Sequence, residues 1–100
     1  MNGRSGFMSP ADATRRINEL ARSDQMSLVM AKHAKERLQE RELIQADLLH
    51  VLKQGFVYND PEPASRDGYF KYRIEGPTPN SGGRNICAVV IPGGTVIKVI

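Results

Sequence analysis

The chain has 100 residues, with 14 lysines and arginines against 11 aspartates and glutamates, so its formal net charge is +3. A chain of this length can build one modest core, which predicts a single domain over residues 9–100. The mild basic excess is compatible with a polyanionic partner but does not require one.

The sequence shows no signal for export or for insertion into a membrane. Residues 1–8 contain Arg4 but no apolar core of a signal peptide, so they are predicted to form a disordered leader. No stretch is long and apolar enough to cross a bilayer. The single cysteine, Cys87, excludes a disulfide within the chain and a cysteine-based metal site. We therefore expect a cytoplasmic protein in which Cys87 is a small core residue.

Helical signals occupy the first half of the chain. Helices are predicted over residues 10–21, 31–42 and 45–54. Ser9 can cap the first of these and Pro10 suits its first position. Gly55 follows the third helix, where left-handed backbone geometry is easy for glycine. The third helix is expected to turn four apolar side chains inward: Ile44, Leu48, Val51 and Leu52.

Strand signals occupy the second half. Strands are predicted over residues 56–59, 69–75, 85–91 and 95–100, with a loop over residues 60–68. Residues 26–30 form either a brief strand or an extended connector. On the strand over residues 69–75, one face carries Phe70, Tyr72 and Ile74, and the other carries Tyr69, Lys71 and Arg73. The last two strands are nearly continuous in apolar residues, which is typical of central, covered strands. The pattern predicts an α+β fold, with N-terminal helices packed on a small antiparallel sheet.

The second predicted helix carries His33, Arg37 and Arg41 at spacings of four, which places the three side chains along one edge. A proton-exchanging group beside two permanent cations suits an RNA phosphate. The alternative is a solvated helix face, where Arg37 and Arg41 pair with carboxylates such as Glu40, and Glu36 pairs with a neighbouring lysine. Spacing alone favours the solvated face.

The same segment carries a family resemblance. The residues concerned are His33-Ala34, Arg37, Glu40-Arg41, Leu43-Ile44, Asp47-Leu48, Val51-Leu52 and Gly55, followed by Gly76, Gly83-Arg84 and the apolar run Cys87 to Val90. In this order they resemble the signature of the family known as domain of unknown function 4258, over roughly residues 10–100. Two positions differ from the family pattern: Ala31 stands where members often have a hydroxyl cap, and Glu42 where many have glycine.

The resemblance implies a RelE-like architecture, related to the BrnT and MqsR groups. It implies the toxin of a bacterial type II toxin–antitoxin pair, a cognate antitoxin as partner, and metal-independent cleavage of RNA. By position it carries four residues across as catalytic: His33, Arg37, Arg41 and Arg84.

Metal-independent RNA cleavage uses the 2′-hydroxyl as nucleophile and needs a general base, a general acid and cations near the phosphate. Histidine suits either proton role and arginine suits the phosphate, while a lysine or tyrosine remains open for the base. Lys71 and Arg73 could bind RNA from one sheet face, and Tyr69 could stack on a base. A cleft between the second helix and that sheet edge would collect these groups. The competing interpretation of Lys71 and Arg73 is the wet face of an amphipathic strand.

Two functions therefore compete. The first is an endoribonuclease toxin with RNA and an antitoxin as partners, without cofactor or metal. The second is a non-catalytic module that binds RNA through the basic edge, or binds a protein across the last strand if that strand lies at a sheet edge. Either function is compatible with a homodimer.

Overall fold

The computed structural model describes residues 6–100, which form an α+β domain. The helices are α1 (Pro10–Arg22), α2 (Lys32–Glu40), α3 (Gln45–Gln54) and the short 3₁₀ turn η1 (Pro79–Ser81). The strands are β1 (Ser27–Met30), β2 (Phe56–Val57), β3 (Glu62–Pro63), β4 (Phe70–Pro77), β5 (Asn85–Gly93) and β6 (Val96–Val99). The α+β class expected from the sequence is confirmed.

The first helix starts as its residues predict. The Ser9 side chain accepts a hydrogen bond from the Asp12 backbone N–H at 3.2 Å, and Pro10 is the first helical residue. Just before it, the Met8 backbone N–H donates to the Tyr72 hydroxyl at 2.9 Å, and Phe7 packs edge-on against Phe70. Residues 1–5 of the expected leader lie outside the described residues.

The sheet is mixed, which corrects the expectation of an antiparallel sheet. Its order is β1-β6-β5-β4-β2, with β3 paired to β4, and β1 runs parallel to β6. The segment over residues 26–30 is thus an edge strand, held in part by a hydrogen bond from Ser27 N–H to Thr95 O at 2.9 Å. Because β1 covers β6, the last strand is interior and offers no free edge to a partner.

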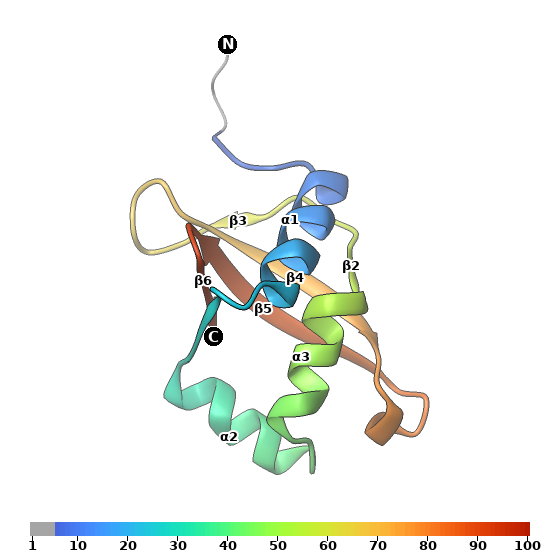
Figure 1. Cartoon of the computed structure of the whole chain (residues 1–100). Helices are drawn as coiled ribbons and strands as arrows, with labels where there is room; N and C mark the ends of the chain where they lie inside the picture. The colour runs from blue at the N-terminus through green and yellow to red at the C-terminus, as the bar shows by residue number, and fades with distance from the viewer. Residues whose placement is uncertain (1–5) are drawn as a thin grey trace.

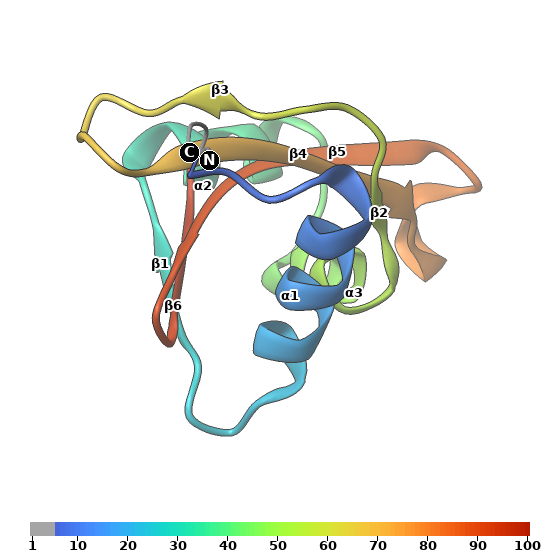
Figure 2. The same cartoon turned by 90° about the horizontal axis from the view of Figure 1, so that it is seen from above.

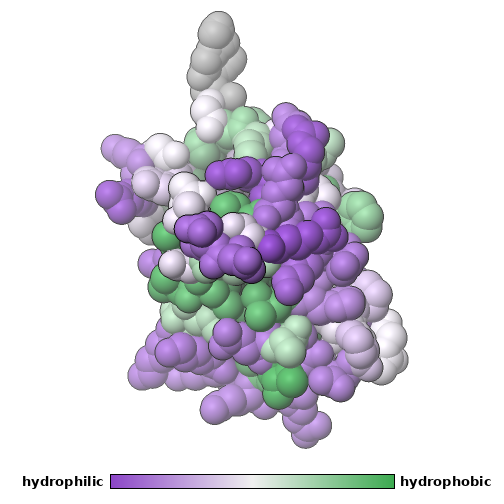
Figure 3. Space-filling view, in the orientation of Figure 1, coloured by the Kyte–Doolittle hydropathy of each residue, from purple (hydrophilic) through white to green (hydrophobic). Residues whose placement is uncertain are grey.

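The core lies between the concave face of the sheet and two helices. Helices α1 and α3 lie together on one side of β4 and β5, and the β1–β6 pair curves around them (Figures 1 and 2). The side chains with no exposed surface come from both layers: Ala13, Ile17, Val51, Leu52, Ile74, Val90 and Ile97. The predicted alternation on β4 is confirmed, since Tyr72 and Ile74 are buried while Arg73 is exposed. On the face seen in Figure 3 hydrophilic side chains predominate, with a smaller hydrophobic band between the α1 and α2 regions.

Two expectations for α3 are wrong. Ile44 is 58 % exposed because it is the residue before the helix and does not share its inward face. Gly55 has φ −79° and ψ −179°, which is extended rather than left-handed. Glycine is required there for a different reason: a Cβ atom would lie 2.6 Å from Val51 O and 2.8 Å from Glu75 O. The missing side chain lets α3 turn directly into β2 beside β4.

Asp47 is a buried carboxylate that ties the start of α3 to η1. It is 3 % exposed and its Oδ2 accepts a hydrogen bond from the Ile44 backbone N–H at 2.9 Å. The Thr78 hydroxyl donates to Oδ1 at 3.0 Å, and the Asn80 side-chain amide donates to Oδ2 at 3.4 Å. The Ile44 N–H lowers the pKa of Asp47 below its ordinary value of 3.8, against an opposing effect of burial, with Thr78 and Asn80 adding to the lowering.

This network predicts a pH-dependent stability. Because the folded-state pKa of Asp47 is lower than the unfolded-state pKa, its contribution is full above about pH 3.8 and is lost as pH falls through the folded value. Asp47→Asn is expected to lower the melting temperature at pH 7 and to weaken its fall in acid. Thermal melts from pH 7 to pH 2.5 measure both effects. Asp12→Asn, an exposed carboxylate in α1, is the control and should change little; equal acid profiles for Asp47→Asn and wild type would contradict the assignment.

Candidate functional site

Helix α2 lies where the sheet lacks a strand. Strand β5 spans Asn85–Gly93, but β6 pairs only with residues 90–93, and the pairing ends with a hydrogen bond from Ile100 N–H to Val89 O at 3.0 Å. The first half of β5 therefore has β4 on one side and no strand on the other. Residues Ala34, Arg37 and Leu38 of α2 line a small space with residues 86–89 of β5. The helix thus forms a wall along the free edge of β5.

Both ends of α2 are set by the backbone. The chain leaves β1 through a hydrogen bond from Ala31 N–H to Val99 O at 2.9 Å and enters the helix without a side-chain cap. At the other end Glu42 adopts φ +58°, the left-handed geometry that favours glycine. The N–H of Leu43 then reaches back to Leu38 O at 2.9 Å. Glycine would adopt this geometry with less strain than Glu42.

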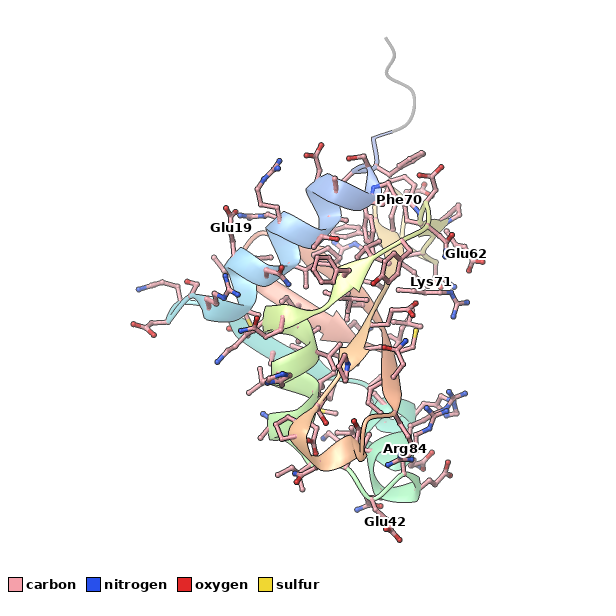
Figure 4. The ribbon with its side chains drawn as sticks, turned by 90° about the vertical axis from the view of Figure 1, so that its right-hand side faces the viewer. Glu19, Glu42, Glu62, Phe70, Lys71 and Arg84 are labelled. Carbon is pink, nitrogen blue, oxygen red and sulfur yellow. The ribbon has the colours of Figure 1, made fainter. Side chains whose placement is uncertain are left out.

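A pocket of about 370 Å³ lies between α2 and β4. Its lining residues come from α2, β3, β4, β5 and the chain end: His33, Arg37, Glu62, Lys71, Arg73, Val89 and Ile100. Figure 4 shows Glu62 and Lys71 beside each other on the side of the molecule where α2 lies, consistent with their direct pairing across β3 and β4. Four of the residues singled out in the sequence are thus brought together: His33, Arg37, Lys71 and Arg73.

The third residue of the helix ladder lines a second, more apolar space. Arg41 borders a pocket of about 80 Å³ together with Arg37, and the rest of its wall is mostly aliphatic. Cys87 also lines this pocket and is exposed, which corrects the expectation that it is a core residue. Among residues 6–100 no helix covers the outward face of β5, so Cys87, Val89 and Ile91 remain accessible although residues 86–91 are all apolar.

A third pocket of about 440 Å³ continues the groove over the outer face of β5 and β6. It contains Tyr69, with Arg66, Lys71 and Lys98 as its cations. Lys71 and Ile100 line both this pocket and the one beside His33, so the two spaces are neighbours. We call the three pockets together the cationic groove.

The charges of the cationic groove are strongly one-sided. Its lining residues include six lysines and arginines and one acidic side chain: Arg37, Arg41, Arg66, Lys71, Arg73 and Lys98, against Glu62. Among residues 6–100 the ion pairs are Arg15–Asp12 at 2.6 Å and His33–Glu36 at 3.9 Å. The pairing of Arg37 and Arg41 with Glu40, expected for an ordinary solvated helix face, is not formed within this part of the chain.

Arg84 stands apart from the other predicted site residues. It lines none of the three pockets, and its Nε donates to Ser81 O at 2.8 Å in the η1 turn. In Figure 4 it lies away from Lys71 and Glu62. The expected cleft therefore does not collect Arg84, which instead holds the turn before β5.

Glu62 lines the pocket beside His33, and the sequence analysis did not single it out. It falls between Pro61 and Pro63, a pattern that predicts a loop, yet residues 62 and 63 pair with β4 as the short strand β3. Proline is tolerated in such an edge strand because its missing N–H can face away from the neighbouring strand. The only signal that could have found it is the opposite charge of Lys71 on the partner strand.

Within residues 6–100, no group of three or more His, Cys, Asp or Glu side chains is arranged to hold a metal ion. Over the same residues, none of the helices has the length and apolar character needed to cross a membrane.

One protein-family model matches most of the chain. It is described as a domain of unknown function (DUF4258), and the match covers residues 30–100. The match thus contains α2, β3 and β4, which border the pocket beside His33, and begins after α1, later than the resemblance seen in the sequence. No curated protein and no solved structure matches the chain.

The left-handed residue at the end of α2 gives a stability prediction. Glu42→Gly is expected to raise the free energy of unfolding by about 0.5–1 kcal/mol, because relief of the left-handed strain exceeds the extra entropy that glycine loses on folding. Urea unfolding measures it. Lys35→Gly, at an exposed position inside α2, is the control and should lower the free energy by about 1 kcal/mol. A loss of stability in both variants would contradict the geometry at position 42.

The position of Cys87 gives a second prediction. Its thiol should react with an aromatic disulfide reagent in the native protein, at a rate within about tenfold of that in urea, because the side chain is exposed on the outer face of β5. Absorbance of the released thiolate measures the rate. Reaction only after unfolding would place the thiol in the core and contradict the described face.

Proposed function

Because this chain belongs to the DUF4258 family, and because its cationic groove gathers groups suited to RNA, we propose that it is an endoribonuclease that cleaves RNA without a metal ion. The observation that carries the proposal is the pocket of about 370 Å³ lined by His33, Arg37, Lys71 and Arg73. These residues come from two elements far apart in the sequence, α2 and β4, and they supply one imidazole, two guanidinium groups and one ammonium group.

Phosphate binding follows from the placement of the cations. Arg37 comes from the helix wall and Arg73 from the sheet floor, so a phosphodiester between them can accept hydrogen bonds from two sides. A guanidinium donates two parallel hydrogen bonds to such a group, and Lys71 adds a compact charge. None of the three has an ion-pair partner among residues 6–100, so no internal salt bridge has to break when phosphate binds.

The pocket also holds two groups that can move the protons. An ionised carboxylate only accepts a proton, whereas an imidazolium can donate one. We assign Glu62 as the base that removes the proton from the 2′-hydroxyl, and His33 as the acid that protonates the leaving 5′-oxygen. The O2′–P bond forms as the P–O5′ bond breaks, which leaves a 2′,3′-cyclic phosphate and a 5′-hydroxyl. The arginines and Lys71 stabilise the charge that grows on the phosphoryl oxygens.

The cellular role proposed with this activity is that of a toxin in a bacterial type II toxin–antitoxin pair. The α+β arrangement of helices on a strongly curved sheet supports a RelE-like architecture for the domain. A ribonuclease that acts on cellular RNA in the cytoplasm must be held inactive, and a cognate antitoxin that covers the cationic groove would do so. Expression without that antitoxin is expected to arrest growth.

A second candidate function is a non-catalytic RNA-binding module, and one observation favours it. The His33 side chain is 69 % exposed, and the nearest carboxylate, Glu36, is 3.9 Å away and 50 % exposed. Such an imidazole is weakly oriented, which suits binding better than proton transfer. The related idea of a protein partner that pairs with the last strand is excluded by β1, which occupies that edge.

The test is cleavage of a radiolabelled RNA by purified protein in the presence of a chelator. We expect wild type to release fragments ending in cyclic phosphate, His33→Ala to be slower by about 10²–10⁴-fold, and Arg37→Ala by about 10²–10³-fold. His50→Ala and Arg15→Ala are matched controls, because neither side chain lines the cationic groove. Both controls should retain wild-type rates.

Two results would count against the enzyme. Wild type that binds RNA in a salt-sensitive manner without cleaving it would support the non-catalytic module instead. Cleavage that survives unchanged in both His33→Ala and Arg37→Ala would show that the pocket is not its site.

A further inference from the structure

The cationic groove continues beyond the phosphate pocket into a space of different chemistry. The pocket of about 440 Å³ has aliphatic walls from Ile91 and Val96, the aromatic ring of Tyr69, and the cations Arg66 and Lys98 at its border. Its volume falls within the range of about 300–1,000 Å³ that is typical of small-ligand sites. It shares Lys71 with the phosphate pocket, so a ligand in one space directly adjoins a ligand in the other.

Both backbone polar groups of Tyr69 are hydrogen-bonded within the turn before β4. Its N–H donates to Arg66 O at 3.2 Å, and its carbonyl accepts from Ala64 N–H at 2.9 Å, so the turn before β4 holds the residue in place. The Arg66 guanidinium carbon lies 5.1 Å from the centre of the Tyr69 ring, in cation–π contact. Arg66 and Tyr69 therefore present a guanidinium group and an aromatic ring together at the border of the groove.

Gly93 determines how closely the Tyr69 ring approaches the sheet. A Cβ atom at position 93 would lie 3.0 Å from Tyr69 Cε1, closer than nearly all real contacts of this kind. The glycine has no left-handed backbone angle, so its need for a missing side chain comes from the ring alone. The ring is therefore packed against the end of β5 rather than free in solvent, although 37 % of Tyr69 remains exposed.

We propose that this pocket binds the nucleobase next to the scissile phosphate, and that the groove therefore selects single-stranded RNA. The proposal rests on the proposed function, since the phosphate pocket supplies the neighbouring site. A base can enter between the aliphatic walls and stack on the partly exposed Tyr69 ring, beside Arg66, only if it is not already paired and stacked in a duplex. Lys71, which borders both pockets, contacts the phosphate that joins the two nucleotides.

Binding measured without cleavage tests this proposal. Fluorescence anisotropy in a His33→Ala background compares a labelled single-stranded RNA, the same RNA as a duplex, and a ribose-phosphate chain without bases. We expect single-stranded RNA to bind about tenfold or more tightly than either of the other two. Tyr69→Ala should remove about tenfold of that affinity, and Tyr69→Phe should restore it. Tyr58→Ala, a 63 % exposed tyrosine outside the groove, is the matched control and should leave binding unchanged.

Gly93→Ala provides a variant that removes no polar group. It is expected to weaken single-stranded RNA binding by about threefold to tenfold while leaving binding of the base-free chain unchanged, because it moves only the ring.

The proposal is overturned if the base-free chain or the duplex binds as tightly as the single strand, if Tyr69→Ala binds like wild type, or if no single-stranded RNA binds. If these tests fail while wild type still cleaves RNA, the base site is wrong and the enzyme stands. If Tyr69-dependent binding holds while wild type cleaves nothing, the base site stands and the enzyme is wrong.

Discussion

The cationic groove depends on a mismatch of length between two neighbouring strands. β5 pairs with β4 along residues 85–90, but β6 pairs with β5 only from Val90 onward. Backbone groups along the unpaired half of β5 would meet water unless another element covered them. Helix α2 lies beside that half, across a small pocket, and brings His33 and Arg37 to the same pocket as Lys71 and Arg73 of β4. A longer β6 would occupy the place of α2 beside β5 and would leave no room for His33 and Arg37 in the pocket shared with β4.

The two faces of the sheet differ in burial and in charge. The concave face, packed with Ile17, Leu52 and Ile74, supplies the burial that stabilises the domain. The outer face carries cations without ion-pair partners among residues 6–100, an arrangement that adds little stability and leaves the charges available to a polyanion. Because no groove cation belongs to the buried core, substitutions in the groove should change binding without unfolding the protein.

Features that depend on a single helix or strand could be predicted from the sequence. The cap at Ser9, the bounds of α3 and the alternation of Tyr72 and Arg73 on β4 follow from short-range chemistry and are as predicted. Pairings between distant segments could not be read in the same way. The four residues of β1, Ser27–Met30, carry no pattern that predicts parallel pairing with β6. The apolar run around Cys87 likewise does not indicate that its side chain faces solvent. The gathering of His33, Arg37, Lys71 and Arg73 around one pocket follows from the spacing on α2 and β4. The position of Glu62 and the separation of Arg84 from that pocket depend on β3 and η1, and the prolines in these segments predict loops instead.

We propose that RNA lies across the outer face between α2 and β4. The most direct measurement is a backbone amide NMR titration of His33→Ala with a short single-stranded RNA. We expect the largest shift changes at Arg37, Lys71, Arg73 and Val89, and none along α1, which packs on the opposite face of the sheet. Shift changes centred on α1 and α3, or none at RNA concentrations that saturate binding, would contradict it.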